Sequence, residues 1–152
     1  MSNSLVLLRA ASVAALLAVG LTGCSPLRPS QKIDIYEAAL SGAQEVPPVA
    51  TSASGQAEVQ LDTLTNVIKW KVTYAGLTGP VSGAHMHGPA GPGQNAGVAV
   101  GFSGNLNAQP ILGETKLTPQ QADQLASGQW YVNLHTPAHP NGEIRGQLRP
   151  RR

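Results

Sequence analysis

The chain has 152 residues, only 12% of them charged, and its formal net charge of +2 is nearly balanced. This charge, with no basic stripe interleaved with aromatic residues, excludes a nucleic-acid-binding surface. The 17 glycines, 12 prolines and short alternating apolar runs are typical of an all-β domain. A single cysteine excludes a disulfide within the chain, so an apolar core has to provide the stability.

The first residues predict export. A positive start that includes Arg9 precedes an almost unbroken apolar run over 10–21, too short for a convincing membrane span. The run ends in Leu21-Thr22-Gly23-Cys24, which resembles the lipobox of bacterial lipoproteins. The resemblance implies a signal peptide over 1–23, cleavage before Cys24 and lipid on its thiol. The alternative is an ordinary signal peptide with a cysteine near its end.

A lipid on Cys24 would anchor the protein to a membrane without a spanning helix. Ser25 is the kind of residue that indicates outer-membrane sorting in Gram-negative cells, so we expect an outer-membrane lipoprotein facing the periplasm or the cell surface. Residues 24–32 would be the lipidated cysteine and a proline-containing tether. Any metal site in the remaining chain then needs nitrogen and oxygen ligands, with methionine sulfur as the one soft option.

Residues 33–148 are expected to form one domain, a Greek-key β-sandwich or barrel of about seven to nine antiparallel strands. Period-two alternation is clearest in 55–62 and 67–74, which predict a hairpin. Besides a strand through the first histidines, we expect strands at 33–40, 55–62, 67–74, 97–102, 106–112, 130–135 and 143–148.

One short helix is expected near 119–126. Thr118 suits its N-cap, Pro119 its first position, and Gln121 the third position of a capping box. Further on, Asn141-Gly142 is a tight-turn dipeptide and predicts the turn between the last two strands. Residues 149–152 are a basic tail, expected to be solvated or to touch anionic lipid headgroups.

All four histidines fall in two segments. On a strand, His85 and His87 share a face opposite Met86, which is expected in the core. The same parity places His135 on the polar face of its strand, and His139 follows in a loop. The pairing of the two strands cannot be read from the sequence, so the convergence of these imidazoles is conditional.

Two to four histidines without thiolates suit copper best and zinc less well. We therefore expect a copper site made by His85, His87 and His135, with His139 as a fourth candidate. The alternative for each histidine is a polar residue on a solvated strand face. Glu143 and Arg145 share a strand face and are expected to contact neighbouring strands as structural residues.

Four ordered segments resemble the CHRD (chordin-type) domain. They are Leu40-Ser41-Gly42-Ala43-Gln44-Glu45-Val46-Pro47-Pro48, Gly83-Ala84-His85-Met86-His87-Gly88-Pro89-Ala90, Tyr131-Val132-Asn133-Leu134-His135-Thr136 and Asn141-Gly142-Glu143-Ile144-Arg145-Gly146-Gln147-Leu148. The resemblance implies an extracytoplasmic β-sandwich or barrel and brings no settled activity.

The His-x-His strand also resembles the copper-ligand strand of copper/zinc superoxide dismutases. The chain departs from that family, because it lacks the disulfide cysteines and a recognisable bridging-histidine and aspartate zinc loop.

Three functions follow as hypotheses. The first is copper sequestration or delivery by a membrane-anchored domain. The second is a metal-free surface module that binds protein or carbohydrate. The third is an oxidoreductase, which needs an open coordination position on the metal.

Overall fold

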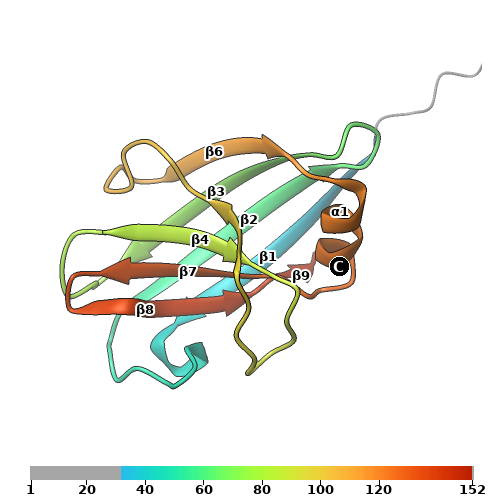
Figure 1. Cartoon of the computed structure of the whole chain (residues 1–152). Helices are drawn as coiled ribbons and strands as arrows, with labels where there is room; N and C mark the ends of the chain where they lie inside the picture. Colours follow the sequence, from blue (N-terminus) through green and yellow to red (C-terminus); the bar gives the residue numbers. More distant parts are fainter. Residues whose placement is uncertain (1–31, 152) are drawn as a thin grey trace, which may run out of the picture.

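The structure is a computed structural model that describes residues 32–151 (Figure 1). The expected signal peptide, Cys24, the tether up to residue 31, and Arg152 all lie outside the described residues. In the part that is described, no helix combines the length and hydropathy needed to cross a membrane.

The regular structure of the described residues consists of nine strands, one short helix and one 3-10 turn, which confirms the all-β class. Its elements in chain order are β1 (Ile33–Ser41), the 3-10 turn η1 (Gly42–Gln44), β2 (Ser54–Asp62), β3 (Val67–Ala75), β4 (Gly83–His87), β5 (Val98–Gly101), β6 (Ile111–Lys116), α1 (Pro119–Ala126), β7 (Tyr131–Thr136), β8 (His139–Gln147) and β9 (Arg149–Pro150). All strand pairs are antiparallel.

The strands form one curled sheet. Eight of them follow the path β5-β4-β7-β8-β1-β2-β3-β6, and β9 pairs with β1. The ladder between β8 and β1 is short, with Ser41 opposite Arg145. The sheet bends at this seam, so that β4, β7 and β8 face β1, β2 and β3 across the interior (Figure 1).

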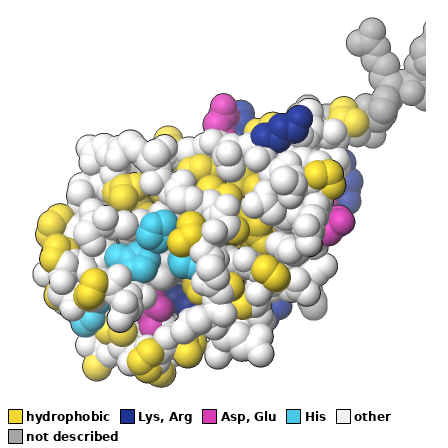
Figure 2. Space-filling view, viewed as in Figure 1, with side chains coloured by type: hydrophobic (Ala, Val, Ile, Leu, Met, Phe, Trp, Pro, Cys, Tyr) yellow, Lys and Arg dark blue, Asp and Glu magenta, His cyan; other side chains and the backbone are white. Residues whose placement is uncertain are grey.

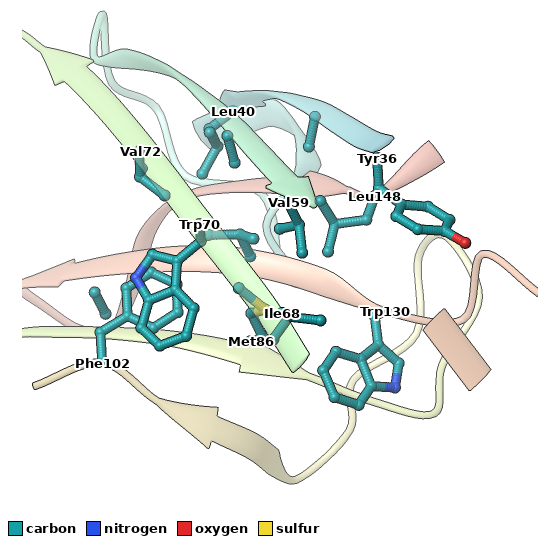
Figure 3. Close-up of a cluster of buried hydrophobic side chains, with 14 of the residues drawn as sticks. Tyr36, Leu40, Val59, Ile68, Trp70, Val72, Met86, Phe102, Trp130 and Leu148 are labelled. Carbon is teal, nitrogen blue, oxygen red and sulfur yellow. The ribbon is translucent and has the colours of Figure 1, made fainter. Parts of the chain in front are cut away.

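The core fills the space between these two halves (Figure 3). Val59 and Ile68 from one half meet Met86 and Val132 from the other, all with 0% exposure. Burying one such side chain contributes about 1.5–3 kcal/mol. The expectation that Met86 is a core methionine is therefore confirmed.

The helix is also confirmed. The Thr118 hydroxyl accepts from the Gln121 backbone N–H at 3.2 Å, and the Thr118 backbone N–H donates to the Gln121 side chain at 2.9 Å. This capping box satisfies two backbone donors that α1 itself cannot pair. Leu125, on the inner side of α1, is fully buried, so the helix covers one end of the core.

The strand expected at 106–112 is misplaced. The observed strand β6 begins at Ile111 and pairs with β3 from Val72 to Val67. Pro110 has no N–H for a ladder, and Asn105 turns the preceding chain by accepting from the N–H groups of Asn107 and Ala108.

The prediction of a turn at Asn141-Gly142 is also wrong. Thr136 pairs with His139, so the two-residue turn lies at Pro137 and Ala138, and the Asn-Gly pair lies inside β8. There the register shifts, and Gly142 has φ = +121°. The dipeptide therefore serves an irregular strand, because glycine allows this conformation in a bulge as well as in a turn.

The basic tail is not simply solvated. Arg149 and Pro150 form β9 against β1, with Arg149 opposite Glu37. Arg151 makes ion pairs with Glu37 and Glu58, although all three side chains remain partly exposed.

Candidate metal centre

The two histidine segments are neighbouring strands. β4 pairs with β7, with Gly83 opposite His135, His85 opposite Asn133 and His87 opposite Tyr131. This pairing brings His85, His87 and His135 together, with one ring nitrogen of each within 4.8 Å of the others. Figure 2 shows a group of histidine side chains gathered on this face of the domain.

Two of the imidazoles are oriented by backbone carbonyls. Nδ1 of His87 donates to the Ala96 carbonyl at 3.0 Å, and Nδ1 of His135 donates to the Pro140 carbonyl at 3.0 Å. Because a carbonyl only accepts, each Nδ1 must carry the proton. In the neutral ring, Nε2 is then left with a free lone pair, which is the arrangement that metal-binding histidines commonly have.

These lone pairs point at the side chain of Asn133. Its Oδ1 lies 3.0 Å from His87 Nε2 and 3.1 Å from His135 Nε2. His85 Nδ1 lies 3.0 Å from the same His135 Nε2. Three ring nitrogens and one amide oxygen from two strands therefore lie in one group, linked by contacts of 3.0–3.1 Å. Asn133 was not identified from the sequence, although its parity with His135 was a usable signal.

His85 and His135 favour their neutral form, because the pKa of each is lowered. Burial lowers the pKa of His85, and the neighbouring His135 and His87 lower it further. Burial also lowers the pKa of His135, against the opposing effect of its hydrogen bond to Pro140. Neutral imidazoles are the form that binds metals, so proton competition at these two rings is reduced.

The outer face of β7 is covered rather than solvated, which the sequence did not predict. Tyr131 and Asn133 are both 3% exposed, and the Gly/Pro-rich loop 88–97 folds over Tyr131. Ala96 in this loop accepts from His87 and contacts the Tyr131 hydroxyl. The loop therefore fixes the His87 ring, a role that its turn-rich composition alone did not indicate.

Tyr131 lies between two charged or ionisable groups. Its ring stacks on His87, with centroids 4.8 Å apart and planes 2° apart, and the Arg145 guanidinium lies 3.4 Å from its centroid. Arg145 is 1% exposed and donates to Asn95 Oδ1 at 2.9 Å and to the Gln94 carbonyl at 2.6 Å. Arg145 thus anchors the covering loop, which confirms its structural role.

Glu143 is likewise structural. It is fully buried and accepts hydrogen bonds from the hydroxyls of Thr51, Thr78 and Thr136 and from the Thr78 backbone N–H. Thr136 belongs to the neighbouring strand β7, as expected for a cross-strand contact. The other two contacts tie loops to the sheet.

Glu45 is a second buried carboxyl that the sequence reading missed. It is 6% exposed, and its Oε1 has no hydrogen-bond partner. Burial raises its pKa to about 7, although the charge of Arg145 and the Val46 backbone N–H act in the opposite direction. Its carboxyl lies beside Gly142, close to the Asn133 amide nitrogen.

His139 does not belong to the group of three histidines. It lies at the start of β8, and it lines a separate cavity of about 240 Å³ together with Glu45 and Asn141. The structure therefore brings together three of the four histidine candidates. Cys24 lies outside the described residues.

Comparison with known proteins places this geometry in a family context. A sequence model described as the CHRD domain matches residues 36–148, which is most of the chain and includes every strand from β2 to β8. No solved structure matches the chain.

Proposed function

The chain belongs to the CHRD domain family, and from that premise we propose that its domain binds one copper ion through His85, His87 and His135. The role is sequestration or delivery of the metal. Each of these side chains comes from one of two hydrogen-bonded neighbouring strands, so the group is held together without the metal, which reduces the ordering cost of binding.

One observation carries the proposal: three imidazole nitrogens lie within 4.8 Å of one another, and two of the rings are oriented by carbonyls of Ala96 and Pro140. Ligands about 2 Å from one ion are about 3–4 Å apart, so only small rearrangements are needed. An imidazole set binds copper more tightly than zinc in the general order of divalent metals, which favours copper.

We also propose that the protein is an outer-membrane lipoprotein anchored through Cys24. The support is the lipobox-like Leu21-Thr22-Gly23-Cys24 directly after an apolar run. The single cysteine of the sequence would then be used for attachment, which leaves nitrogen and oxygen atoms to bind the metal.

Copper titration of the purified full chain tests the metal site. We expect one equivalent of copper to bind with micromolar or tighter affinity, and the double variant His85→Ala/His87→Ala to lose at least about 100-fold, because two ligands are removed. The measurement is competition against a chelator of known affinity, with zinc titrated in parallel.

His139→Ala is the matched control, because His139 lies outside the group of three and this variant should bind copper like the parent chain. Stoichiometric binding that survives the double variant would overturn the site. Zinc binding tighter than copper binding would overturn the choice of metal.

A further inference from the structure

We infer that the side-chain oxygen of Asn133 is a fourth ligand in this site, and that the resulting set of three nitrogens and one oxygen selects Cu(II) over Cu(I). The inference rests on the proposed copper site. It adds a ligand that the histidine pattern does not include and a preference for one oxidation state.

The spacing of the four atoms fits ligands of a single ion. Going round the site, His85 Nδ1 to His135 Nε2 is 3.0 Å, His135 Nε2 to Asn133 Oδ1 is 3.1 Å, and Asn133 Oδ1 to His87 Nε2 is 3.0 Å. Neighbouring ligands about 2.0–2.1 Å from an ion lie about 2.9 Å apart at right angles and about 3.3 Å apart in a tetrahedron. The three distances lie between these two values, so the four atoms can share one ion after small shifts, and Cu(II) with nitrogen and oxygen ligands prefers the square arrangement.

The chemistry of the converging atoms points to a cation. Nε2 of His87 and Nε2 of His135 present lone pairs, because Nδ1 of each ring donates to a carbonyl. Asn133 Oδ1 is also an acceptor, and it is placed between them in a residue that is 3% exposed. With Nδ1 of both rings protonated, the two nitrogens and the oxygen all present lone pairs, which a metal ion between them would use as ligand bonds.

The orientation of the Asn133 amide has a cause in its surroundings. A Cβ at Gly142 would lie 2.5 Å from Glu45 Oε1 and 2.9 Å from Asn133 Nδ2, so both groups occupy the space beside this glycine. Glu45 Oε1 has no hydrogen-bond partner, and an oxygen without a donor favours the NH₂ group of Asn133 over its Oδ1 on this side. Oδ1 is then turned toward the histidines.

Soft ligands are missing from the part of the site that the structure describes. Met86 lies on β4 between His85 and His87, but it has 0% exposure and points into the core on the opposite face of the strand. Cu(I) prefers thiolate and thioether sulfur, whereas imidazole with a carbonyl oxygen suits a divalent ion. The ligand set therefore matches Cu(II).

The test compares Asn133→Leu, which has a similar size but no oxygen, with the parent full chain. We expect Cu(II) affinity to fall by about 10–100-fold and Cu(I) affinity to change much less. Electron paramagnetic resonance of the Cu(II) form should give a tetragonal signal in the parent chain and an altered hyperfine splitting in Asn133→Leu.

Asn133→Asp keeps the oxygen and adds charge, so it should retain Cu(II) binding with a spectrum shifted by the stronger donor; it also serves if Asn133→Leu does not fold. Asn105→Asp, an exposed change outside the site, is the control and should match the parent spectrum. Cu(II) binding by the parent chain with the same spectrum in both Asn133 variants would overturn the inference and leave the histidine site standing. No copper binding by the parent chain would instead overturn the proposed function.

Discussion

The buried Glu143 side chain holds several distant segments of the chain together. Its two oxygens collect hydrogen bonds from Thr51, Thr78 and Thr136, three points that are far apart in the chain. Burial alone would raise the pKa of Glu143, but these hydrogen bonds outweigh it and hold the pKa below its usual value. The charged form is therefore part of the folded state, and it holds two loops against β8.

The lowered pKa has a defined consequence for stability. Because the pKa is lower in the folded chain than in the unfolded chain, Glu143 stabilises the fold above the ordinary carboxyl pKa, and this contribution is lost as pH falls through the folded value. We expect the free energy of unfolding to decrease on acidification below pH 4.5, the ordinary value. Urea titrations over a pH series measure this, and Glu143→Gln should flatten that part of the dependence.

Thr136→Val tests the same network at one contact. The hydroxyl donates to Glu143 Oε2 at 2.7 Å inside the protein, and hydrogen bonds to charged groups are worth about 1.5–3 kcal/mol. We expect a loss of that size in urea unfolding at neutral pH. Thr73→Val on β3 makes the same chemical change outside this network and should cost much less, and equal losses in the two variants would contradict this account.

At the scale of strands and helices, the sequence predicted correctly the elements whose signals lie within a few neighbouring residues. Period-two alternation located β2 and β3, and the capping residues located α1, because these signals lie within a few neighbouring residues. The pairing of β4 with β7 is a long-range fact, set by packing of the two halves of the sheet. Strand parity could therefore assign the histidines to a face without showing that they meet.

The same difference between local and long-range signals explains which features of the site the sequence did not predict. The place of Asn133 depends on register, and the burial of Tyr131 depends on a loop from another part of the chain. Asn141-Gly142 was misread because a glycine signal fits both a turn and an irregular strand, and only the distant Glu45 and Asn133 explain why this position has no side chain.

A substitution in the loop 88–97 tests whether the conformation of this loop supports the fold and the metal site. A Cβ at Gly88 would lie 2.2 Å from Cδ1 of the fully buried Trp130, so Gly88→Ala has to displace the ring or the loop. Overpacking of this kind costs about 1–3 kcal/mol. We expect a lower melting temperature and weaker copper binding, because the loop carries the Ala96 carbonyl that orients His87.

Gly91→Ala is the control within the same loop. Its Cβ would meet only the Gln94 side chain, at 3.7 Å, so it should leave both the melting temperature and copper affinity unchanged. Equal effects of the two substitutions would show that the loop responds to any added side chain.

For the molecule as a whole, the proposed membrane attachment and the proposed metal binding involve different parts of the chain and can be tested separately. The proposed lipid lies on Cys24, whereas the histidine site lies on β4 and β7. We expect Cys24→Ala to move the protein from the membrane fraction to the soluble fraction after cell breakage, with the copper affinity of the purified chain unchanged. Retention of Cys24→Ala in the membrane fraction would contradict the anchor.

The start of the described chain lies far from the three histidines. The first strand starts beside the turn between β2 and β3, where Ile33 lies opposite Asp62, and Figures 1 and 2 place this end of the domain away from the histidine patch. If the proposed lipid on Cys24 and the proposed copper site are both real, the membrane attachment and the metal therefore lie at different ends of the domain, and the metal stays open to partners that approach from the aqueous side.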